Sequence, residues 1–319
     1  MCDRPTGPWP LPLPPGEKPP IPPTSVWPTG QRDLPAQLRD SGCVPGTETD
    51  PHLIPPAVAA HAIATYTHPG DLVLDPVCGA GTVLVEALRA GRHALGLASQ
   101  RRWWAIARAN ITATKAAGAW RDGSVLDAHP RVLAGIRAAG LVGRVGLVLT
   151  TVRTPTDDST TSPDRDPDAG LDSALVDLTA TMFYCEPLLR SGGHLVVVAQ
   201  PRRHPDGALV DLPTRLIAAA ASAGLVPIER CVALTAALRG GRLITRASFA
   251  ERRAAARAPG APVALTAHRE VVIFQLGHDA ELAAAAGTAW PGHPVVAPQQ
   301  RTHRGNNGTA YDPDGRRAA

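Results

Sequence analysis

The sequence predicts an α/β fold built on a doubly wound, mostly parallel sheet with helices on both faces. Short runs rich in Val and Leu alternate with helical patterns through the middle of the chain, and parallel strands need such helical crossovers. The first run, DLVLDP, leads directly into a glycine turn and a helix from Thr82 to Ala90. The last two strand-like runs have no full-length helix between them, which predicts an antiparallel edge hairpin.

The predicted elements follow one another from about Pro55 onward. They are a helix over PAVAAHAIATY, a strand over DLVLDP, the helix 82–90, a strand over HALGLA, a helix over 101–119, a weak strand over 120–126, a helix over 131–140, a strand over RVGLVLT, a helix over 171–190 stopped by Ser191-Gly192-Gly193, a strand over HLVVVAQ, a helix over 209–223, and strands over 225–236 and 262–276.

The 319 residues suit one folded domain, which we place at 51–278. Proline recurs every two or three residues from Arg4 to Pro28, so residues 1–50 are predicted to form a Pro-rich, largely disordered arm. Residues 279–319 lack periodicity and are predicted to form a loose tail. The polar stretch TPTDDSTTSPDRDPDAG, after the strand over RVGLVLT, is predicted to be a flexible loop.

The composition excludes several classes of protein. The five cysteines are scattered without a CxxC pair, so we expect neither a disulfide framework nor a metal site, and a reducing, cytoplasmic location fits best. No run approaches 18 apolar residues, so no membrane span is expected. The net charge of +4 rests almost wholly on arginine and only weakly favours nucleic acid as a partner.

The turn DPVCGAGT, residues 75–82, is the most informative motif. Gly79 and Gly81 permit a close backbone approach, and the helix that follows offers free N–H groups to a ligand. A dinucleotide site would have GxGxxG instead. The string resembles the cofactor motif DPFCGSGT of DNA methyltransferases that act on exocyclic amino groups of adenine or cytosine, and it differs only at Val77 and Ala80. Similar segments extend over roughly Ser25 to Leu276.

This resemblance implies a class I methyltransferase fold, which is Rossmann-like, with S-adenosyl-L-methionine as cofactor and DNA as partner. The residues that it assigns to cofactor binding are Asp75, Pro76, Val77, Cys78, Gly79, Gly81 and Thr82. Two further cofactor positions depart from the family. Ala98 stands where an acidic residue would hold the ribose hydroxyls, and Ser124 stands where an aspartate would reach the adenine amino group.

Asp127 beside Ser124 is either an adenine contact or the N-cap of the helix near Pro130. Trp103 and Trp104 stand where the family carries an aromatic beside the adenine ring, so one of them is a candidate to border the cofactor, but core packing is the favoured role for each. His268 and Glu270 are interpreted as a surface pair without chemistry.

The fourth-strand motif departs most. The family has (S/N/D)PP(Y/F/W), which grips and stacks on a flipped base, whereas this chain has Thr151-Val152-Arg153-Thr154. Thr151 and Thr154 remain as candidate catalytic residues.

A second candidate surface is arginine-rich. The predicted DNA contacts are Arg239, Arg242, Arg246, Arg252 and Arg253, with Arg257 close by, although a solvated helix face would explain them too.

These observations leave three function hypotheses. The first is an S-adenosylmethionine-dependent DNA methyltransferase with a degenerate fourth-strand motif. The second is a catalytically inactive pseudo-methyltransferase that acts as a DNA- or partner-binding module. The third is a small-molecule or RNA methyltransferase that reuses the same pocket.

Overall fold

The computed structural model describes residues 23–136, 140–154, 167–204, 208–257 and 263–280. Its ten strands are β1 (Val26–Trp27), β2 (Leu72–Asp75), β3 (His93–Leu97), β4 (Gly123–Leu126), β5 (Val145–Thr151), β6 (Leu189–Ala199), β7 (Leu225–Leu234), β8 (Ala237–Arg239), β9 (Arg242–Ile244) and β10 (His268–Leu276). Its helices are α1 (Leu34–Asp40), α2 (Pro56–Tyr66), α3 (Thr82–Arg89), α4 (Arg101–Ala116), α5 (Leu133–Ile136), α6 (Pro167–Cys185), α7 (Leu212–Ser222) and α8 (Phe249–Arg257).

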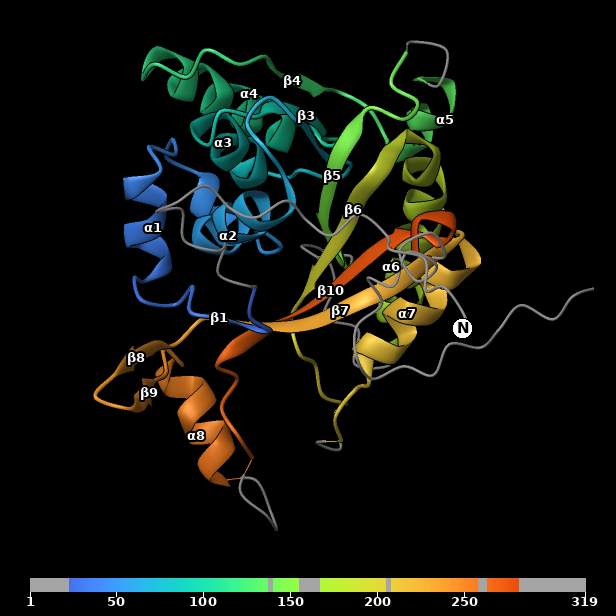
Figure 1. Cartoon of the computed structure of the whole chain (residues 1–319). Coiled ribbons are helices and arrows are strands. Elements are labelled where there is room, and N and C mark those ends of the chain that lie inside the picture. The colour runs from blue at the N-terminus through green and yellow to red at the C-terminus, as the bar shows by residue number, and fades with distance from the viewer. Residues whose placement is uncertain (1–22, 137–139, 155–166, 205–207, 258–262, 281–319) are drawn as a thin grey trace, which may run out of the picture. The chain divides into compact units, whose positions relative to one another are not determined.

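Eight strands form one sheet in the order β1-β7-β10-β6-β5-β2-β3-β4 (Figure 1). Strands β2 to β6 pair in parallel, and β10 runs antiparallel between β6 and β7. The predicted α/β class and antiparallel pair are confirmed. The two-residue β1, which the sequence did not predict, lies outside β7 and pairs with it in parallel.

The central strands of the sheet are buried on both faces, because successive side chains point to opposite sides and helices pack on each side. In β10, Val272 and Phe274 pack with α6 and α7, whereas Val271 and Ile273 pack with α2 and α3. All four side chains are fully buried. This two-sided burial explains why the strands have nearly continuous apolar sequences.

Two boundaries differ from the prediction. The helix expected over 171–190 ends at Cys185, and β6 begins at Leu189 rather than at His194. Pro187 lacks a backbone N–H group, so the α-helix does not continue through it. The start of α6, at Pro167, lies inside the stretch predicted to be a loop, and residues 155–166 of that stretch lie outside the described residues.

The arm predicted at residues 1–50 is folded from residue 23 onward, so that prediction was wrong for this part. Trp27 is fully buried, with its ring 4.6 Å from His61 and 6.5 Å from Tyr66 of α2, centroid to centroid. Proline frequency misled the prediction because apolar anchors among the prolines find partners elsewhere in the chain. Residues 1–22 and the tail from 281 lie outside the described residues.

No helix in the described part of the chain is long and apolar enough to cross a membrane.

We predict that Trp27→Ala lowers the free energy of unfolding by about 3–5 kcal/mol, because it removes a large, fully buried side chain. Urea denaturation measures the change. Trp120→Ala is the matched control, since Trp120 is 72% exposed, and it should change stability by less than about 0.5 kcal/mol. Equal effects of the two substitutions would show that residues 23–50 do not belong to the cooperative fold.

Candidate functional site

The glycine turn lies at the carboxyl edge of the sheet, between β2 and α3. β2 pairs with β3 on one side and with β5 on the other, so the chain changes direction across the sheet at this point. Open α/β sheets bind ligands in the crevice at such a switch point. The sequence motif therefore occupies the position where the fold favours a ligand.

The two glycines of the turn have different roles. Both have positive φ, 51° at Gly79 and 84° at Gly81. A Cβ on Gly81 would lie 2.9 Å from the Cβ of Ala107, so Gly81 allows α4 to pack closely. The Gly81 N–H donates to the carbonyl oxygen of Cys78 at 2.8 Å, which closes the turn. Gly79 instead borders the crevice.

Asp75 ends β2 and is almost completely buried. Its Oδ1 accepts a hydrogen bond from the Val77 N–H at 3.1 Å. Burial raises the pKa of this carboxyl from 3.8 to about 7, although the nearby Arg153 lowers it. Asp75 is therefore a carboxyl that can change its charge near neutral pH.

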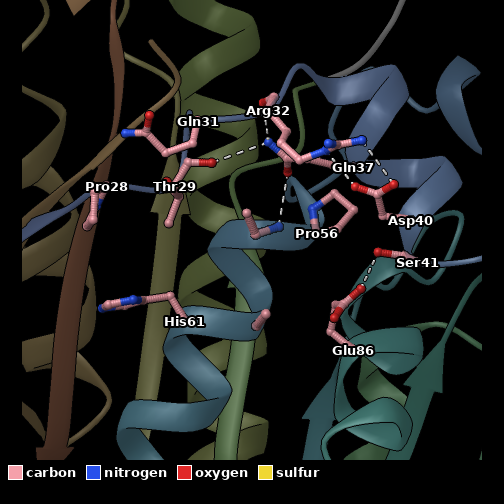
Figure 2. A pocket seen from close by; sticks show the side chains of 12 residues that line it. Pro28, Thr29, Gln31, Arg32, Gln37, Asp40, Ser41, Pro56, His61 and Glu86 are labelled. Carbon is pink, nitrogen blue, oxygen red and sulfur yellow. Dashed lines mark hydrogen bonds and ion pairs between the residues drawn. The ribbon is translucent and has the colours of Figure 1, made fainter. Parts of the chain in front are cut away.

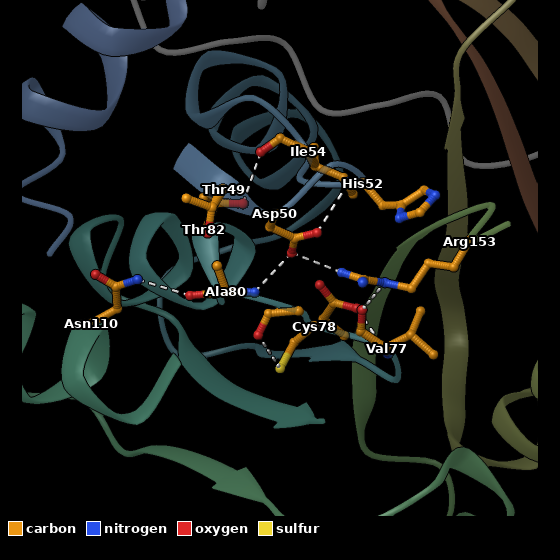
Figure 3. Close-up of polar contacts among 12 residues, drawn as sticks. Thr49, Asp50, His52, Ile54, Val77, Cys78, Ala80, Thr82, Asn110 and Arg153 are labelled. Carbon is orange, nitrogen blue, oxygen red and sulfur yellow. Dashed lines mark hydrogen bonds and ion pairs between the residues drawn. The ribbon is translucent and has the colours of Figure 1, made fainter. Parts of the chain in front are cut away.

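A segment before α2 covers the glycine turn (Figure 3). Asp50 Oδ2 accepts a hydrogen bond from the Ala80 N–H at 2.9 Å, and the Thr82 hydroxyl donates to the carbonyl oxygen of Ile54 at 2.8 Å. Asn110 of α4 donates to the carbonyl oxygen of Ala80 at 2.8 Å. Both sides of the turn are thus held by side chains from distant parts of the sequence.

Arg153, two residues after β5, reaches across to this turn (Figure 3). Its Nε donates to the carbonyl oxygen of Val77 at 2.8 Å, and its Nη2 donates to Asp50 Oδ2 at 3.0 Å. The Asp50 side chain is completely buried and that of Arg153 is 24% exposed. An ion pair therefore occupies the space beside Gly79.

The two candidate catalytic threonines have different surroundings. Thr151 is the last residue of β5. Thr154 has polar side chains on two sides: Arg202 Nη2 donates to its Oγ1 at 2.7 Å, and His52 Nε2 lies 3.2 Å from the same oxygen. The pKa of His52 is lowered by burial first and by Arg153 second, which favours a neutral imidazole.

Ala98 and Ser124, the predicted ribose and adenine positions, do not line the same cavity in the structure. Ala98 borders a cavity of about 80 Å³ together with Gly79, Trp103 and Arg153. Ser124 is exposed on β4 and does not line this cavity. Trp103 lines it, whereas Trp104 donates from its Nε1 to the carbonyl oxygen of Val125 at 3.3 Å.

The proposed N-cap role of Asp127 is wrong. His129 caps the 3-10 helix before α5 and accepts a hydrogen bond from the Arg131 N–H. The alternative role of Asp127, an adenine contact, stays a prediction.

Three residues of this site, Asp50, His52 and Arg202, were not among those predicted from the sequence. From the sequence, Arg153 was identified only as part of the degenerate fourth-strand motif. Asp50 lies in a segment predicted to be disordered, and no local pattern marks it. The one available signal was the charge of Arg153 in a motif that normally holds proline at that position.

A separate hollow of about 500 Å³ lies beside α1 and α2 (Figure 2). Two pairs of its polar side chains contact one another. The Ser41 hydroxyl donates to Glu86 Oε1 at 2.5 Å, and Arg32 pairs with Asp40. None of the predicted cofactor residues lines it.

The predicted DNA-contacting arginines lie on β8, β9 and α8 and on the segments that connect them, which together we call the arginine projection (residues 237–257). The side chains of Arg239, Arg242 and Arg253 are exposed. Arg246 and Arg252 are exposed as well. Arg246 also donates to the carbonyl oxygens of Gly30 and Gln31, and Arg252 donates to those of Thr245 and Ala247. These two therefore also stabilise the projection itself.

His268 and Glu270 form the expected pair, with Nε2 and Oε1 3.4 Å apart. Both side chains are partly buried, and Glu270 also pairs with Arg230 at 3.4 Å.

A comparison with known protein families finds a match in the N-terminal part of the chain. A family model described as DNA methylase, of the N6/N4 type, matches residues 17–108, which span β1 to α4 and include the glycine turn. The resemblance to the N6/N4 DNA methylases is confirmed. The family match supports S-adenosyl-L-methionine as the cofactor.

Solved structures that this chain resembles include TrmN, TYW2 in complex with AdoMet, and a methyltransferase described as SAM-dependent. TrmN from Thermus thermophilus is 16% identical, with a TM-score of 0.44, over 75% of this chain and 53% of its own length. A methyltransferase from Agrobacterium tumefaciens is 13% identical, with a TM-score of 0.44, over 70% and 63%. TYW2 from M. jannaschii is 12% identical, with a TM-score of 0.39, over 68% and 74%. The chain thus spans about half the length of TrmN.

We predict that Asp75→Asn stabilises the protein relative to the wild type increasingly as pH rises from 4 to 7. The native carboxyl keeps its proton up to about pH 7, whereas the unfolded one loses it near 3.8, so wild-type stability falls across this range. The difference should approach at most about 4 kcal/mol, since one pKa unit is about 1.4 kcal/mol.

Urea denaturation at several pH values measures this difference. Asp177→Asn, which changes an exposed aspartate of α6, is the matched control for the loss of one carboxylate. A stability difference between the wild type and the Asp75→Asn variant that stays constant between pH 4 and 7 would contradict the raised pKa.

Proposed function

We propose that the protein is an S-adenosylmethionine-dependent DNA methyltransferase that acts on an exocyclic amino group of adenine or cytosine. The observation that carries this proposal is the turn DPVCGAGT at the switch point between β2 and β5, inside the segment that matches the DNA methylase family. When bound, the cofactor supplies an electrophilic methyl group to the target nitrogen. The proposed cofactor-binding residues are those of the glycine turn, with Trp103 beside them, namely Asp75, Pro76, Val77, Cys78, Gly79, Gly81 and Thr82.

The chain's own residues have separate tasks in this proposal. The glycine turn positions the cofactor, and the N-terminal end of α3 offers it backbone N–H groups. Thr154 lies where the family's motif holds the target base, and the neutral His52 beside it is the group available to accept a proton from the nitrogen. Thr151, the last residue of β5, is the second candidate catalytic residue at the carboxyl edge of the sheet.

DNA contact is proposed for the arginine projection. It exposes Arg239, Arg242 and Arg253, whose guanidinium groups suit phosphate and guanine. Arg246 and Arg269 line a cavity of about 230 Å³ with His268 and Gln200, at the carboxyl edge of the sheet. Arginine side chains are therefore found both on the projection and in this cavity, where Glu251 is also present.

The second candidate function is that of an inactive module that binds DNA or a protein partner. It is favoured by the loss of the acidic residue at Ala98 and of the whole fourth-strand motif. The arginine projection also exposes large apolar side chains, namely Leu238, Leu243, Ile244 and Phe249. Such side chains mark interaction surfaces when they gather in one place.

The proposed function predicts that the protein transfers radiolabelled methyl groups from S-adenosylmethionine to double-stranded DNA. Nucleoside analysis by mass spectrometry should then detect N6-methyladenine or N4-methylcytosine. Asp75→Ala should abolish the transfer, because it removes the carboxyl at the base of the glycine turn. DNA binding without any transfer, in protein that binds the cofactor, would favour the inactive module instead.

The DNA surface has its own test. Replacing Arg242 and Arg253 together with alanine should weaken binding to DNA and reduce the slope of log K against log salt by about 2, since each lost phosphate contact contributes about 0.9. Arg131→Ala with Arg144→Ala is the matched control, because both arginines are exposed and lie outside the projection. If both double variants weaken binding equally, the arginine projection is not the DNA surface.

A further inference from the structure

The ion pair between Asp50 and Arg153 lies directly on the residue that should admit the cofactor. A Cβ placed on Gly79 would come within 1.9 Å of both Arg153 Nη2 and Asp50 Oδ2. Glycine at this position leaves room for a close approach, and the approaching groups are two side chains of the protein itself. The space above Gly79 is therefore filled.

The pair makes the contacts that an amino acid would make there. The Asp50 carboxylate accepts hydrogen bonds from the N–H groups of Ala80 and His52, at 2.9 and 3.0 Å, and Ala80 immediately precedes the N-cap of α3. The Arg153 guanidinium donates to the carbonyl oxygen of Val77. The methionine part of S-adenosylmethionine carries the same two kinds of group, a carboxylate that accepts N–H bonds and an ammonium that donates to carbonyls.

The remaining space is too small for the whole cofactor. The cavity bordered by Ala98, Gly79 and Arg153 measures about 80 Å³, whereas sites for molecules of this size measure about 300 Å³ or more. The residues of the turn fit the cofactor, but the ion pair beside them does not fit alongside its methionine part. Arg153 must leave Val77 and Asp50 before that part can enter.

We propose that Asp50 and Arg153 form an internal latch that occupies the methionine part of the cofactor site. S-adenosylmethionine then binds only when Arg153 moves away, and the latch lowers affinity for the cofactor. This inference rests on the proposed function for the identity of the ligand. It concerns the amino-acid half of that ligand alone. A ligand without that half should therefore bind without displacing Arg153.

Isothermal titration calorimetry with S-adenosylhomocysteine and with adenosine tests the latch. Arg153→Ala should bind S-adenosylhomocysteine at least tenfold more tightly than the wild type, because the competing guanidinium is gone. Its affinity for adenosine, which has no amino-acid group, should change less than twofold. Arg144→Ala is the matched control: it removes the positive charge of an exposed arginine that does not border the cavity beside Gly79, and it should leave both affinities near those of the wild type.

Arg153→Ala leaves the buried Asp50 carboxylate without its cation and could therefore unfold the protein, so a second variant is needed. Asp50→Asn combined with Arg153→Ala removes both charges and should also bind S-adenosylhomocysteine more tightly than the wild type. Thermal unfolding confirms that each variant is folded.

Three results would overturn the latch. Weaker binding by Arg153→Ala would make Arg153 a ligand of the cofactor's carboxylate rather than its competitor. Equal affinity in the wild type and both variants would overturn the latch and leave the proposed function intact. No binding of S-adenosylhomocysteine to any of the folded proteins would overturn the latch and the cofactor function together.

Discussion

The buried carboxylate of Asp50 joins three parts of the chain that are far apart in sequence. It binds the Ala80 N–H of the glycine turn, the His52 N–H of its own segment and the guanidinium of Arg153 after β5. A fully buried charge requires such partners, since an uncompensated one would strongly destabilise the fold. The conformation of the turn, the position of the segment before α2 and the direction of Arg153 therefore depend on one another.

Much of the fold is predictable because its signals are local. The strands are short apolar runs, the helices between them repeat with helical spacing, and the glycine turn follows the strand that ends at Asp75. The contribution of residues 23–50 could not be found in this way. Trp27 and Asp50 are ordinary residues in a Pro-rich stretch, and their importance arises from contacts with α2 and with the turn after β2. Burial that depends on distant partners leaves no periodic pattern.

The candidate site was predictable to a similar extent. The motif identified the turn, but no sequence pattern could place Ser124, which is exposed, or find His52 beside Thr154. Arg153 was visible as a departure from a family pattern, yet its role depends on a side-chain path that crosses the crevice to Val77. The glycine turn thus matches the pattern that the resemblance implies, while the charged residues around it differ from that pattern.

This rearrangement connects the two candidate functions. A pseudo-methyltransferase and a latched enzyme would share the same sheet, the same turn and the same arginine projection. They would differ in whether Arg153 can leave Val77 and Asp50 to admit the cofactor. If Ala98 stands at the ribose position that the resemblance implies, affinity for the cofactor is expected to be lower in either case, because a methyl group cannot accept the hydrogen bonds of two hydroxyls.

The most direct test of the latch is a crystal structure of the wild-type protein grown with saturating S-adenosylhomocysteine. We expect density for the ligand across Gly79, with the Arg153 guanidinium displaced from the Val77 carbonyl and from Asp50. A ligand bound at the switch point while Arg153 keeps both contacts would contradict the latch.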